Sequence, residues 1–459
     1  MRKFGAFLSG AISYLAFAPI SIWFAPFIGF FLLYRLLRNQ HLVNRLIISQ
    51  LFGLGLILPN QIWTGTYVGA LPWIILSILQ SFLFWPFAIK VHESKPLIPV
   101  IFAGNAVIVE LLLRTIPFTG FGWSRISFTQ VSSPLNVIYP ILGCSGVIFL
   151  IAFLASNHRI KLTSMIVLVI FSMQFLFQSP ISTESIKIAL VQGGVDQLGL
   201  DFNAKPRAVF NSHLQTTAAN IKPSMVDLII WPENAVDIDL FANRDVKDQI
   251  TALSSNLKTP ILVGGITRRD GKLKNISVLF NPGVDQTYIK RYLTPFGEYI
   301  PLRSILSRVT DLVDQVDDFT AGKKSNVVDI GNLKAQIFIC YELLNDQFKN
   351  EINQDFLIVQ TNNATFGDTA QLDQELQIAQ VRALESGRSI AYVSTTGITS
   401  FIDRDGRIQK SYPKFKSGVL IGQIEIYKDR QINQILQFWP EIFVIFMVFL
   451  IVIWSRRSD

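Results

Sequence analysis

Charged residues are scarce in this chain of 459 residues, and they are unevenly distributed. Only 16% of the residues are charged, whereas soluble domains carry about 25%. Residues 1–180 hold eleven basic and two acidic residues, whereas residues 181–436 hold 28 basic and 29 acidic ones. The net charge of +8 therefore comes from the N-terminal part. Because its basic residues stand between apolar segments, they indicate membrane orientation and do not indicate a nucleic-acid partner.

Histidine and cysteine are also rare, with four and two copies. The chain contains no HExxH motif and no paired CxxC motif, so we expect no metal site and no cofactor. His41, His92 and His158 lie between apolar segments, and His213 lies in a polar stretch where we expect it to be solvated. A Cys–His catalytic pair is therefore disfavoured.

Long apolar runs are abundant instead. A membrane helix needs roughly 20 mostly apolar residues. Eight segments fit this requirement: 4–20, 22–38, 44–61, 68–91, 97–115, 136–156, 161–178 and 437–455. The first segment is either a membrane helix or a cleaved signal peptide, and the apolar segments that follow it favour the helix.

The loops between these segments alternate in charge. The basic loops are 1–3, 35–45, 90–95, 158–161 and 456–457, and the uncharged ones are 18–21 and 60–72. The positive-inside rule places the basic loops in the cytoplasm. We therefore expect a membrane domain of about seven helices at 1–180, an extracytoplasmic domain at 181–436, and a last membrane helix with a cytoplasmic tail at 437–459.

Two stretches leave alternatives open. The loop 115–135 is rich in aromatic residues and glycine, so Phe121 and Trp123 form either an interfacial aromatic belt or a lid under the extracytoplasmic domain. Residues 302–319 carry apolar residues at helical spacing. They predict either a helix packed on its own domain or an arm whose apolar face enters the outer leaflet.

Residues 181–436 alternate between two patterns. Amphipathic stretches at 203–221 and 371–388 predict helices. Short runs rich in Val and Ile predict strands at 186–192, 227–231, 260–266, 276–281, 335–340, 356–361, 390–395 and 418–424. Strands that alternate with helices are typical of an α/β domain built on a largely buried sheet.

Cys340 lies where a buried strand meets a loop. Functional sites in α/β sheets gather at the carboxyl ends of strands, so Cys340 is either a nucleophile or a small buried hydrophobic residue. Cys144 lies within an apolar segment and is expected to be a packing residue. Because the two cysteines are predicted in different compartments, we expect no disulfide bond between them.

A carboxylate and a lysine remain as candidates to activate the thiol. Glu233 follows the predicted strand 227–231, and Lys290 precedes a turn that ends at Glu298. Taken alone, Glu233 and Lys290 are each explained equally well as solvated surface residues. Together with Cys340 they would form an acyl-transfer site, in which the lysine favours the thiolate and the oxyanion and the carboxylate moves protons.

At these residues the chain resembles a known family. The motifs are Trp-Pro-Glu233, Tyr-Ile-Lys290, Pro-Phe-Gly-Glu298 and Ile-Cys340-Tyr341-Glu342. They resemble the carbon–nitrogen hydrolase (nitrilase) superfamily and, over nearly the whole chain, the bacterial apolipoprotein N-acyltransferases. The resemblance implies a four-layer α-β-β-α sandwich joined to the membrane bundle, in the inner membrane with the catalytic domain in the periplasm.

The resemblance also implies an activity. Such enzymes take the sn-1 acyl chain of a phospholipid, such as phosphatidylethanolamine, onto cysteine as a thioester. They pass it to the α-amino group of the diacylglyceryl-cysteine at a lipoprotein N-terminus, as the final step of lipoprotein maturation. The resemblance implies that Glu233 is the general base, that Lys290 is the cation that stabilises the oxyanion, and that Cys340 is the nucleophile. It implies that Glu298 supports Lys290. The family also requires Tyr341 and Glu342 beside the cysteine, in roles that are less well defined.

Some positions depart from the family pattern. Asn363 and Thr365 stand where the family has a carboxylate and a tryptophan, and Glu375 stands where a histidine is usual. These departures bear on acyl-donor preference and acceptor contacts. Two other functions stay open: a membrane-tethered amide or nitrile hydrolase with water as acceptor, and a binding module with a vestigial site. The intact Glu233, Lys290 and Cys340 argue against the binding module.

Overall fold

The computed structural model describes residues 1–89, 97–176, 180–182, 184–281, 285–308, 317–347, 351 and 354–456. The chain divides into two compact units. The helical unit comprises Met1–Ser179, Thr369–Ser386 and Arg430–Asp459, and the α/β unit comprises Pro180–Asp368 and Gly387–Asp429.

Each predicted apolar segment contains a helix of the helical unit. These helices are α1 (Arg2–Tyr14), α2 (Ala25–Leu37), α3 (Leu42–Asn60), α4 (Ala70–Ser81), α5 (Ile98–Thr115), α6 (Tyr139–Ser156), α7 (Ile160–Leu176) and α13 (Trp439–Arg456). Four spans are long and apolar enough to cross a membrane: Leu42–Asn60, Ala70–Ala88, Ile98–Thr115 and Pro134–Ser156. α1 and α2 have 13 residues each, so both are shorter than the segments predicted for them.

Short 3-10 helices connect several of these helices. They are η1 (Ile62–Gly65), η2 (Phe82–Ala88), η3 (Gly122–Ser124), η4 (Ile126–Gln130) and η5 (Pro134–Ile138). Two further helices belong to the same unit although they come late in the chain: α11 (Ala370–Ser386) and α12 (Ile432–Leu436).

Close packing of α1 on α3 depends on glycine. A Cβ atom on Gly10 would lie 2.0 Å from the backbone oxygen of Phe52, and one on Gly55 would lie 2.0 Å from that of Phe7. No side chain fits at these distances, so only glycine allows the two backbones to approach. Small residues at helix crossings are a common means of association between membrane helices.

α11 is held in the helical unit by a buried polar cluster. The Gln374 side-chain oxygen accepts hydrogen bonds from the indole nitrogens of Trp63 at 3.2 Å and Trp123 at 2.6 Å. Its amide nitrogen donates to Asn60 at 3.0 Å. Trp123 is therefore a buried residue of the helical unit. The interfacial belt that loop 115–135 suggested is wrong for Trp123, because its N–H group is paired inside.

Two sheets build the α/β unit. The first has seven strands in the order β13-β1-β2-β4-β5-β6, with β3 paired to β4, and the second has six in the order β12-β11-β10-β9-β8-β7. The first sheet contains β1 (Glu184–Gln192), β2 (Leu228–Ile230), β3 (Val236–Asp239), β4 (Ile261–Arg269), β5 (Lys272–Phe280), β6 (Gln286–Ile289) and β13 (Gly418–Ile426). The second contains β7 (Val327–Ile330), β8 (Leu333–Ile339), β9 (Phe356–Thr361), β10 (Ile390–Ser394), β11 (Thr399–Ile402) and β12 (Ile408–Tyr412).

The eight predicted strands are all present, and the apolar core explains their composition. Residues such as Leu190 and Leu262 of the first sheet pack against Ile337 and Ile358 of the second. Within each sheet the central strands run parallel: β1, β2 and β4 in the first, and β8, β9 and β10 in the second. Strands buried on both faces carry continuous runs of Val, Ile and Leu, which made them visible in the sequence.

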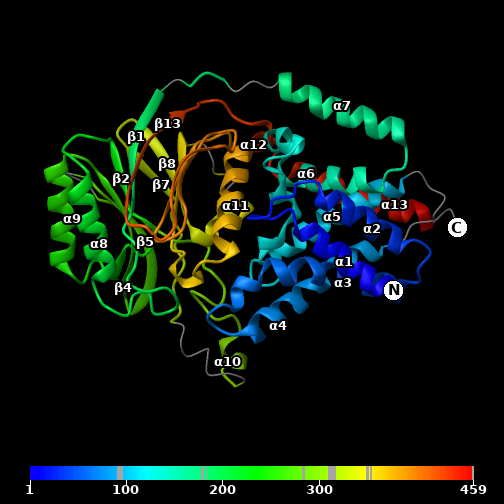
Figure 1. The fold of residues 1–459 in the computed structure, drawn as a ribbon, viewed down its shortest axis with the longest axis horizontal. Coiled ribbons are helices and arrows are strands. Elements are labelled where there is room, and N and C mark those ends of the chain that lie inside the picture. The colour runs from blue at the N-terminus through cyan, green and yellow to red at the C-terminus, as the bar shows by residue number, and fades with distance from the viewer. Residues whose placement is uncertain are drawn as a thin grey trace. The chain divides into compact units, whose positions relative to one another are not determined.

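Helices cover the outer face of the first sheet. α8 (Ala208–Asn220) and α9 (Arg244–Leu257) lie side by side there (Figure 1), and Phe210, Val246 and Ile250 pack on the strands. The α/β unit thus consists of a helical layer and two sheets. The predicted helix at 203–221 is confirmed as α8, and the one at 371–388 as α11, which groups with the helical unit.

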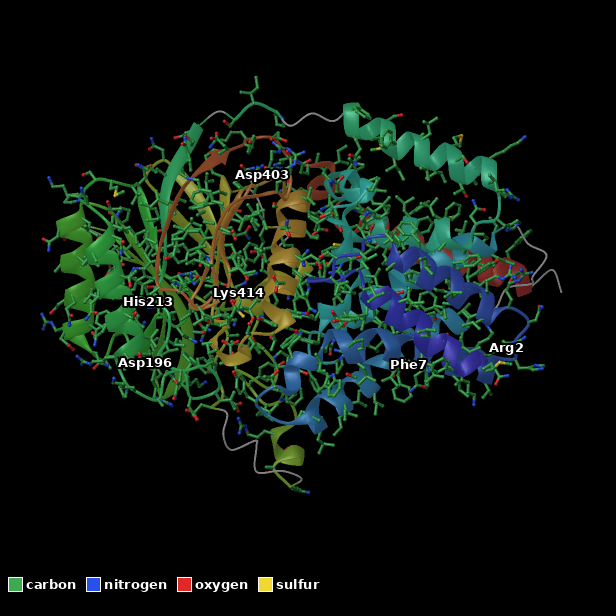
Figure 2. The ribbon with its side chains drawn as sticks, viewed as in Figure 1. Arg2, Phe7, Asp196, His213, Asp403 and Lys414 are labelled. Carbon is green, nitrogen blue, oxygen red and sulfur yellow. The ribbon has the colours of Figure 1, made fainter. Side chains whose placement is uncertain are left out.

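His213 is buried on α8, so the expectation that it is solvated is wrong (Figure 2). Its Nε2 accepts a hydrogen bond from the Gly193 N–H at 3.1 Å, so its Nδ1 carries the proton donated to the Val209 carbonyl at 2.8 Å. Burial lowers the pKa of His213 to about 4, which keeps the ring neutral. Of the predicted helix at 302–319, α10 (Arg303–Leu306) is present, and residues 309–316 lie outside the described part of the chain.

Candidate active site

Glu233 lies just beyond β2, at the carboxyl end of a strand buried in the first sheet. Its Oε1 accepts a hydrogen bond from the Asn275 amide at 2.8 Å, and its Oε2 accepts one from the backbone N–H of Asn362 at 2.9 Å. Gly264 of β4 leaves room for this approach, because a Cβ atom there would lie 2.8 Å from the Glu233 Cα. The carboxylate is thus buried, oriented and hydrogen-bonded on both oxygens.

Lys290 follows β6 directly and is only 1% exposed. Its Nζ lies 2.9 Å from Glu298 Oε2 and 3.4 Å from Glu233 Oε1. Burial alone lowers the pKa of Lys290, but the negative charges of Glu298, Glu233 and Cys340 outweigh it and raise that pKa above its ordinary value. Lys290 therefore stays protonated and can stabilise negative charge that develops beside it.

A tight turn after Lys290 positions Glu298. The backbone N–H groups of Gly297 and Glu298 both donate to the Thr294 carbonyl, at 3.2 and 2.9 Å. The Glu298 carboxylate reaches back to accept from the Thr294 N–H at 2.8 Å. The sequence motif that ends at Glu298 thus folds onto itself and aims the carboxylate at Lys290.

Cys340 follows β8 and begins the 3-10 helix η7 (Cys340–Leu344). It is half-buried, forms no disulfide and has a positive φ of 50°. The left-handed conformation is uncommon for a residue other than glycine, and such strain concentrates at functional sites. The turn places the sulfur at the end of a central strand, where a negative charge on it raises the pKa of Lys290. This position differs from that of an ordinary core cysteine.

Glu342 connects the two segments that carry Lys290 and Cys340. Its Oε1 accepts from the Tyr288 hydroxyl at 2.6 Å and the Arg291 N–H at 2.9 Å, and its Oε2 accepts from the Ile339 N–H at 2.9 Å. Burial raises the pKa of the Glu342 carboxyl. Its partners lie next to Lys290 and Cys340 in the chain, so Glu342 holds the ends of β6 and β8 together.

Tyr341 is buried beside the same cluster. Burial and the neighbouring Tyr299 raise the pKa of its phenol, although the positive charge of Lys290 acts in the opposite direction. The phenol is therefore neutral and can act only as a hydrogen-bonding group near Lys290. All six residues suggested by the sequence thus follow the ends of three strands, β2, β6 and β8.

The sequence reasoning missed Asn275. This residue of β5 donates from its one amide group to both Glu233 Oε1 and Glu298 Oε1, at 2.8 Å each. An asparagine inside a predicted strand carries no distinctive pattern, so only the three-dimensional arrangement shows it.

The positions that depart from the family pattern fall in both units. Asn363 accepts a hydrogen bond from Ser394 at 2.5 Å within the α/β unit, and Thr365 lies half-buried in the 3-10 helix η9 (Ala364–Phe366). Glu375 is buried on α11, where it accepts from Gln371 at 3.1 Å. Among the described residues, no group of three or more His, Cys, Asp or Glu side chains could hold a metal ion.

Comparison with known families covers most of the chain. The model of the apolipoprotein N-acyltransferase N-terminal domain matches residues 9–156, and the carbon-nitrogen hydrolase model matches residues 187–432. The second match takes in the segments that carry Glu233, Lys290 and Cys340. It also agrees with the α/β architecture described above.

Curated relatives align over nearly the full length. An apolipoprotein N-acyltransferase from Mycolicibacterium smegmatis is 30% identical over 92% of this chain and 79% of that protein. One from Haemophilus influenzae is 28% identical over 89% of this chain and 86% of that protein. Among solved structures, a CN-hydrolase superfamily protein from Xanthomonas campestris has a TM-score of 0.39 and 18% identity, covering 53% of this chain and 91% of that one. The two family models and the full-length relatives agree, and the chain belongs to the apolipoprotein N-acyltransferase family.

Proposed function

We propose that this chain transfers an acyl chain from a phospholipid to the α-amino group of a diacylated lipoprotein N-terminus. The observation that carries the proposal is the buried Lys290, which is paired with Glu298 at 2.9 Å and Glu233 at 3.4 Å and is electrostatically coupled to Cys340. A base, a fixed cation and a thiol in one buried cluster support acyl transfer.

In the first half-reaction Glu233 takes the thiol proton of Cys340, and the sulfur attacks the sn-1 ester carbonyl of the phospholipid. Lys290 stabilises the oxyanion of the tetrahedral intermediate. The ester C–O bond then breaks, the acyl chain stays on sulfur as a thioester, and Glu233 returns the proton to the leaving lysophospholipid hydroxyl. Glu298 supports Lys290, and Glu342 and Tyr341 hold the segment of Cys340.

In the second half-reaction the acceptor amine attacks the thioester carbonyl. An N–C bond forms and the C–S bond breaks. Glu233 removes a proton from the attacking nitrogen and returns it to the Cys340 thiolate. The products are an N-acylated lipoprotein and the free enzyme, so the kinetics are ping-pong.

We also propose a topology. The chain crosses the bacterial cytoplasmic membrane about eight times: seven times within residues 1–180 and once within 437–459. The region 181–436 lies on the periplasmic side as the catalytic domain, with its four-layer α-β-β-α sandwich, and both termini are cytoplasmic. The basic loops and the four long apolar helices support this arrangement.

An acyl-transfer assay in detergent micelles tests the function. The purified protein is mixed with phosphatidylethanolamine and a synthetic diacylglyceryl-cysteine peptide, and the products are read by mass spectrometry. We expect the peptide to gain one acyl chain on its α-amino group. The Cys340→Ala variant should give no product, and the Cys144→Ala variant, which removes the other thiol, should keep the activity.

Two outcomes would contradict the proposal. Free fatty acid with an unchanged peptide would indicate that water is the acceptor and would favour a hydrolase. Product formed equally by Cys340→Ala would show that the nucleophile is a different residue.

A further inference from the structure

Asn275 makes an unusual pair of contacts. Its amide nitrogen donates one hydrogen to Glu233 Oε1 and the other to Glu298 Oε1, at 2.8 Å each. Side chains alternate along β5, and Leu279 and Ser277 on the same face point between the two sheets. Asn275 therefore projects from the sheet interior into the gap between the two carboxylates.

The negative charges of the two carboxylates on either side of this gap repel each other. Two carboxylates share one ammonium group, so the cluster has an excess of negative charge in a buried place. Like charges that share a buried site push one of the two carboxyls toward its protonated form. Lys290 lies closer to Glu298, at 2.9 Å, than to Glu233, at 3.4 Å, so Glu233 has the weaker ion pair. Glu233 therefore depends more on its neutral donors.

The orientation of the Asn275 amide is set by these contacts. The opposite orientation would aim its oxygen at two negatively charged groups. In the observed one, Asn275 Oδ1 is buried and has no hydrogen-bond partner among the described residues. A buried acceptor without a hydrogen bond lowers the free energy of unfolding. The Asn275 amide therefore directs both of its N–H groups at the carboxylates at some loss of stability. The Asn275 backbone oxygen also accepts from the Lys290 N–H at 2.9 Å.

We propose that Asn275 is a positioning residue that holds Glu233 and Glu298 side by side, so that Glu233 is available as a base. The proposal rests on the function proposed above. Asn275 acts through Glu233 and Glu298. Its two N–H groups donate the hydrogen bonds to the carboxylates that a second cation would otherwise provide.

The other titratable groups of the cluster come from two segments. Lys290, Glu298 and Tyr299 follow β6, and Cys340, Tyr341 and Glu342 follow β8. Lys290 is the cation that contacts both Glu233 and Glu298. Because Lys290 keeps its proton and the tyrosines stay neutral, loss of the Asn275 donors should appear mainly in the pH dependence of catalysis by the base Glu233.

The test measures acyl-enzyme formation from phosphatidylethanolamine in a single turnover, across about pH 5 to 9. We expect Asn275→Ala to lower the rate constant of acyl-enzyme formation about tenfold to a hundredfold and to move the acidic limb of the profile to higher pH by about one unit. In the Asn275→Asp variant the new side chain has the same shape as asparagine, but it can donate at most one hydrogen bond. In its charged form it adds a third negative charge to the cluster. It should move the acidic limb at least as far.

Asn326→Ala is the matched control. Asn326 is also buried in the α/β unit, but its amide donates to the Ile337 carbonyl at 2.6 Å, away from the two carboxylates. Its variant should keep the wild-type pH profile even if the protein is less stable. Thermal unfolding of each variant shows how much protein is folded.

The outcomes separate the two proposals. If wild-type protein forms no acyl-enzyme, the proposed function fails. If wild-type forms it and both Asn275 variants, still folded, give profiles that superimpose on wild-type after scaling, then Asn275 has a structural role only and the inference is overturned.

Discussion

At the scale of single residues, the buried ion cluster is the feature with the largest energetic consequence. Lys290 is almost fully enclosed, and its carboxylate partners are also buried. Buried charges are tolerated only when they are paired, because removing one partner leaves the others uncompensated. The same charges that favour proton transfer therefore also contribute to the stability of the α/β unit.

Replacing Lys290 should therefore cost both activity and stability. We expect Lys290→Met to abolish acyl-enzyme formation and to destabilise the protein by about 3–5 kcal/mol at neutral pH. The penalty arises because two buried carboxylates then lose their cation. Thermal unfolding of the variant and of wild-type protein measures it.

Lys334→Met is the control for that experiment. Lys334 pairs with Asp329 at 3.0 Å, but both side chains are largely exposed. Exposed pairs contribute about 0–1 kcal/mol, so this variant should be nearly as stable as wild-type. Equal losses in both variants would show that burial of Lys290 has no special energetic role.

His213 makes stability depend on pH. Burial lowers its pKa from 6.5 to about 4, so between these values the unfolded chain binds more protons than the folded one. Its contribution, about 3 kcal/mol, is complete above about pH 6.5 and is lost as the pH falls toward 4. We expect Tm to fall over this range in wild-type protein and to fall less in His213→Gln. The exposed His41→Gln variant should follow wild-type, and identical slopes in all three proteins would refute the assignment.

At the scale of elements, the α1–α3 crossing links sequence to packing most directly. Replacing a glycine inside a helix by alanine normally stabilises the helix by about 1 kcal/mol. At Gly10 and Gly55 the added Cβ would meet a backbone oxygen at 2.0 Å, and the helices would have to separate. We expect Gly10→Ala and Gly55→Ala to lower Tm in detergent.

Gly5 of α1 provides the comparison. A Cβ atom there would lie 3.6 Å from Leu36, an ordinary contact, so Gly5→Ala should be neutral or stabilising. If all three substitutions stabilise the protein alike, the close α1–α3 approach is incorrect.

Two buried side chains of α11, Gln374 and Glu385, make polar contacts with the early helices of the helical unit. Gln374 satisfies two indole N–H groups and Asn60, and Glu385 accepts from the Cys144 N–H at 2.9 Å while pairing with Arg382. A helix that comes late in the chain is thus held among the early helices by polar contacts. In an apolar unit such contacts are specific, because alternative partners are scarce.

At the scale of the whole molecule, the testable quantity is membrane topology. In a Cys144→Ala, Cys340→Ala background, a cysteine in place of the exposed Asn211 on α8 should react with an impermeant maleimide in intact cells. One in place of the exposed His41, in a basic loop, should react only after lysis. The reverse pattern would overturn the proposed orientation.

The local features of this protein can be predicted from its amino-acid sequence. Hydrophobic runs of membrane length, Val- and Ile-rich strands and the motifs around Glu233, Lys290 and Cys340 were all visible, because each is written in neighbouring residues. The strands β3, β6, β7, β11 and β12 were missed, because each of them has only four or five residues.

Tertiary structure alone decided what depends on partners far away in the chain. In the folded chain, Glu233 and Glu298 both contact Asn275, and His213 becomes buried. Trp123 forms a hydrogen bond with Gln374, which lies 251 positions further along the chain. The physical reason is that burial, hydrogen bonding and charge pairing are properties of the neighbours that folding brings together. Residue type and local periodicity specify which groups are available, and the packing of distant segments decides which of them meet.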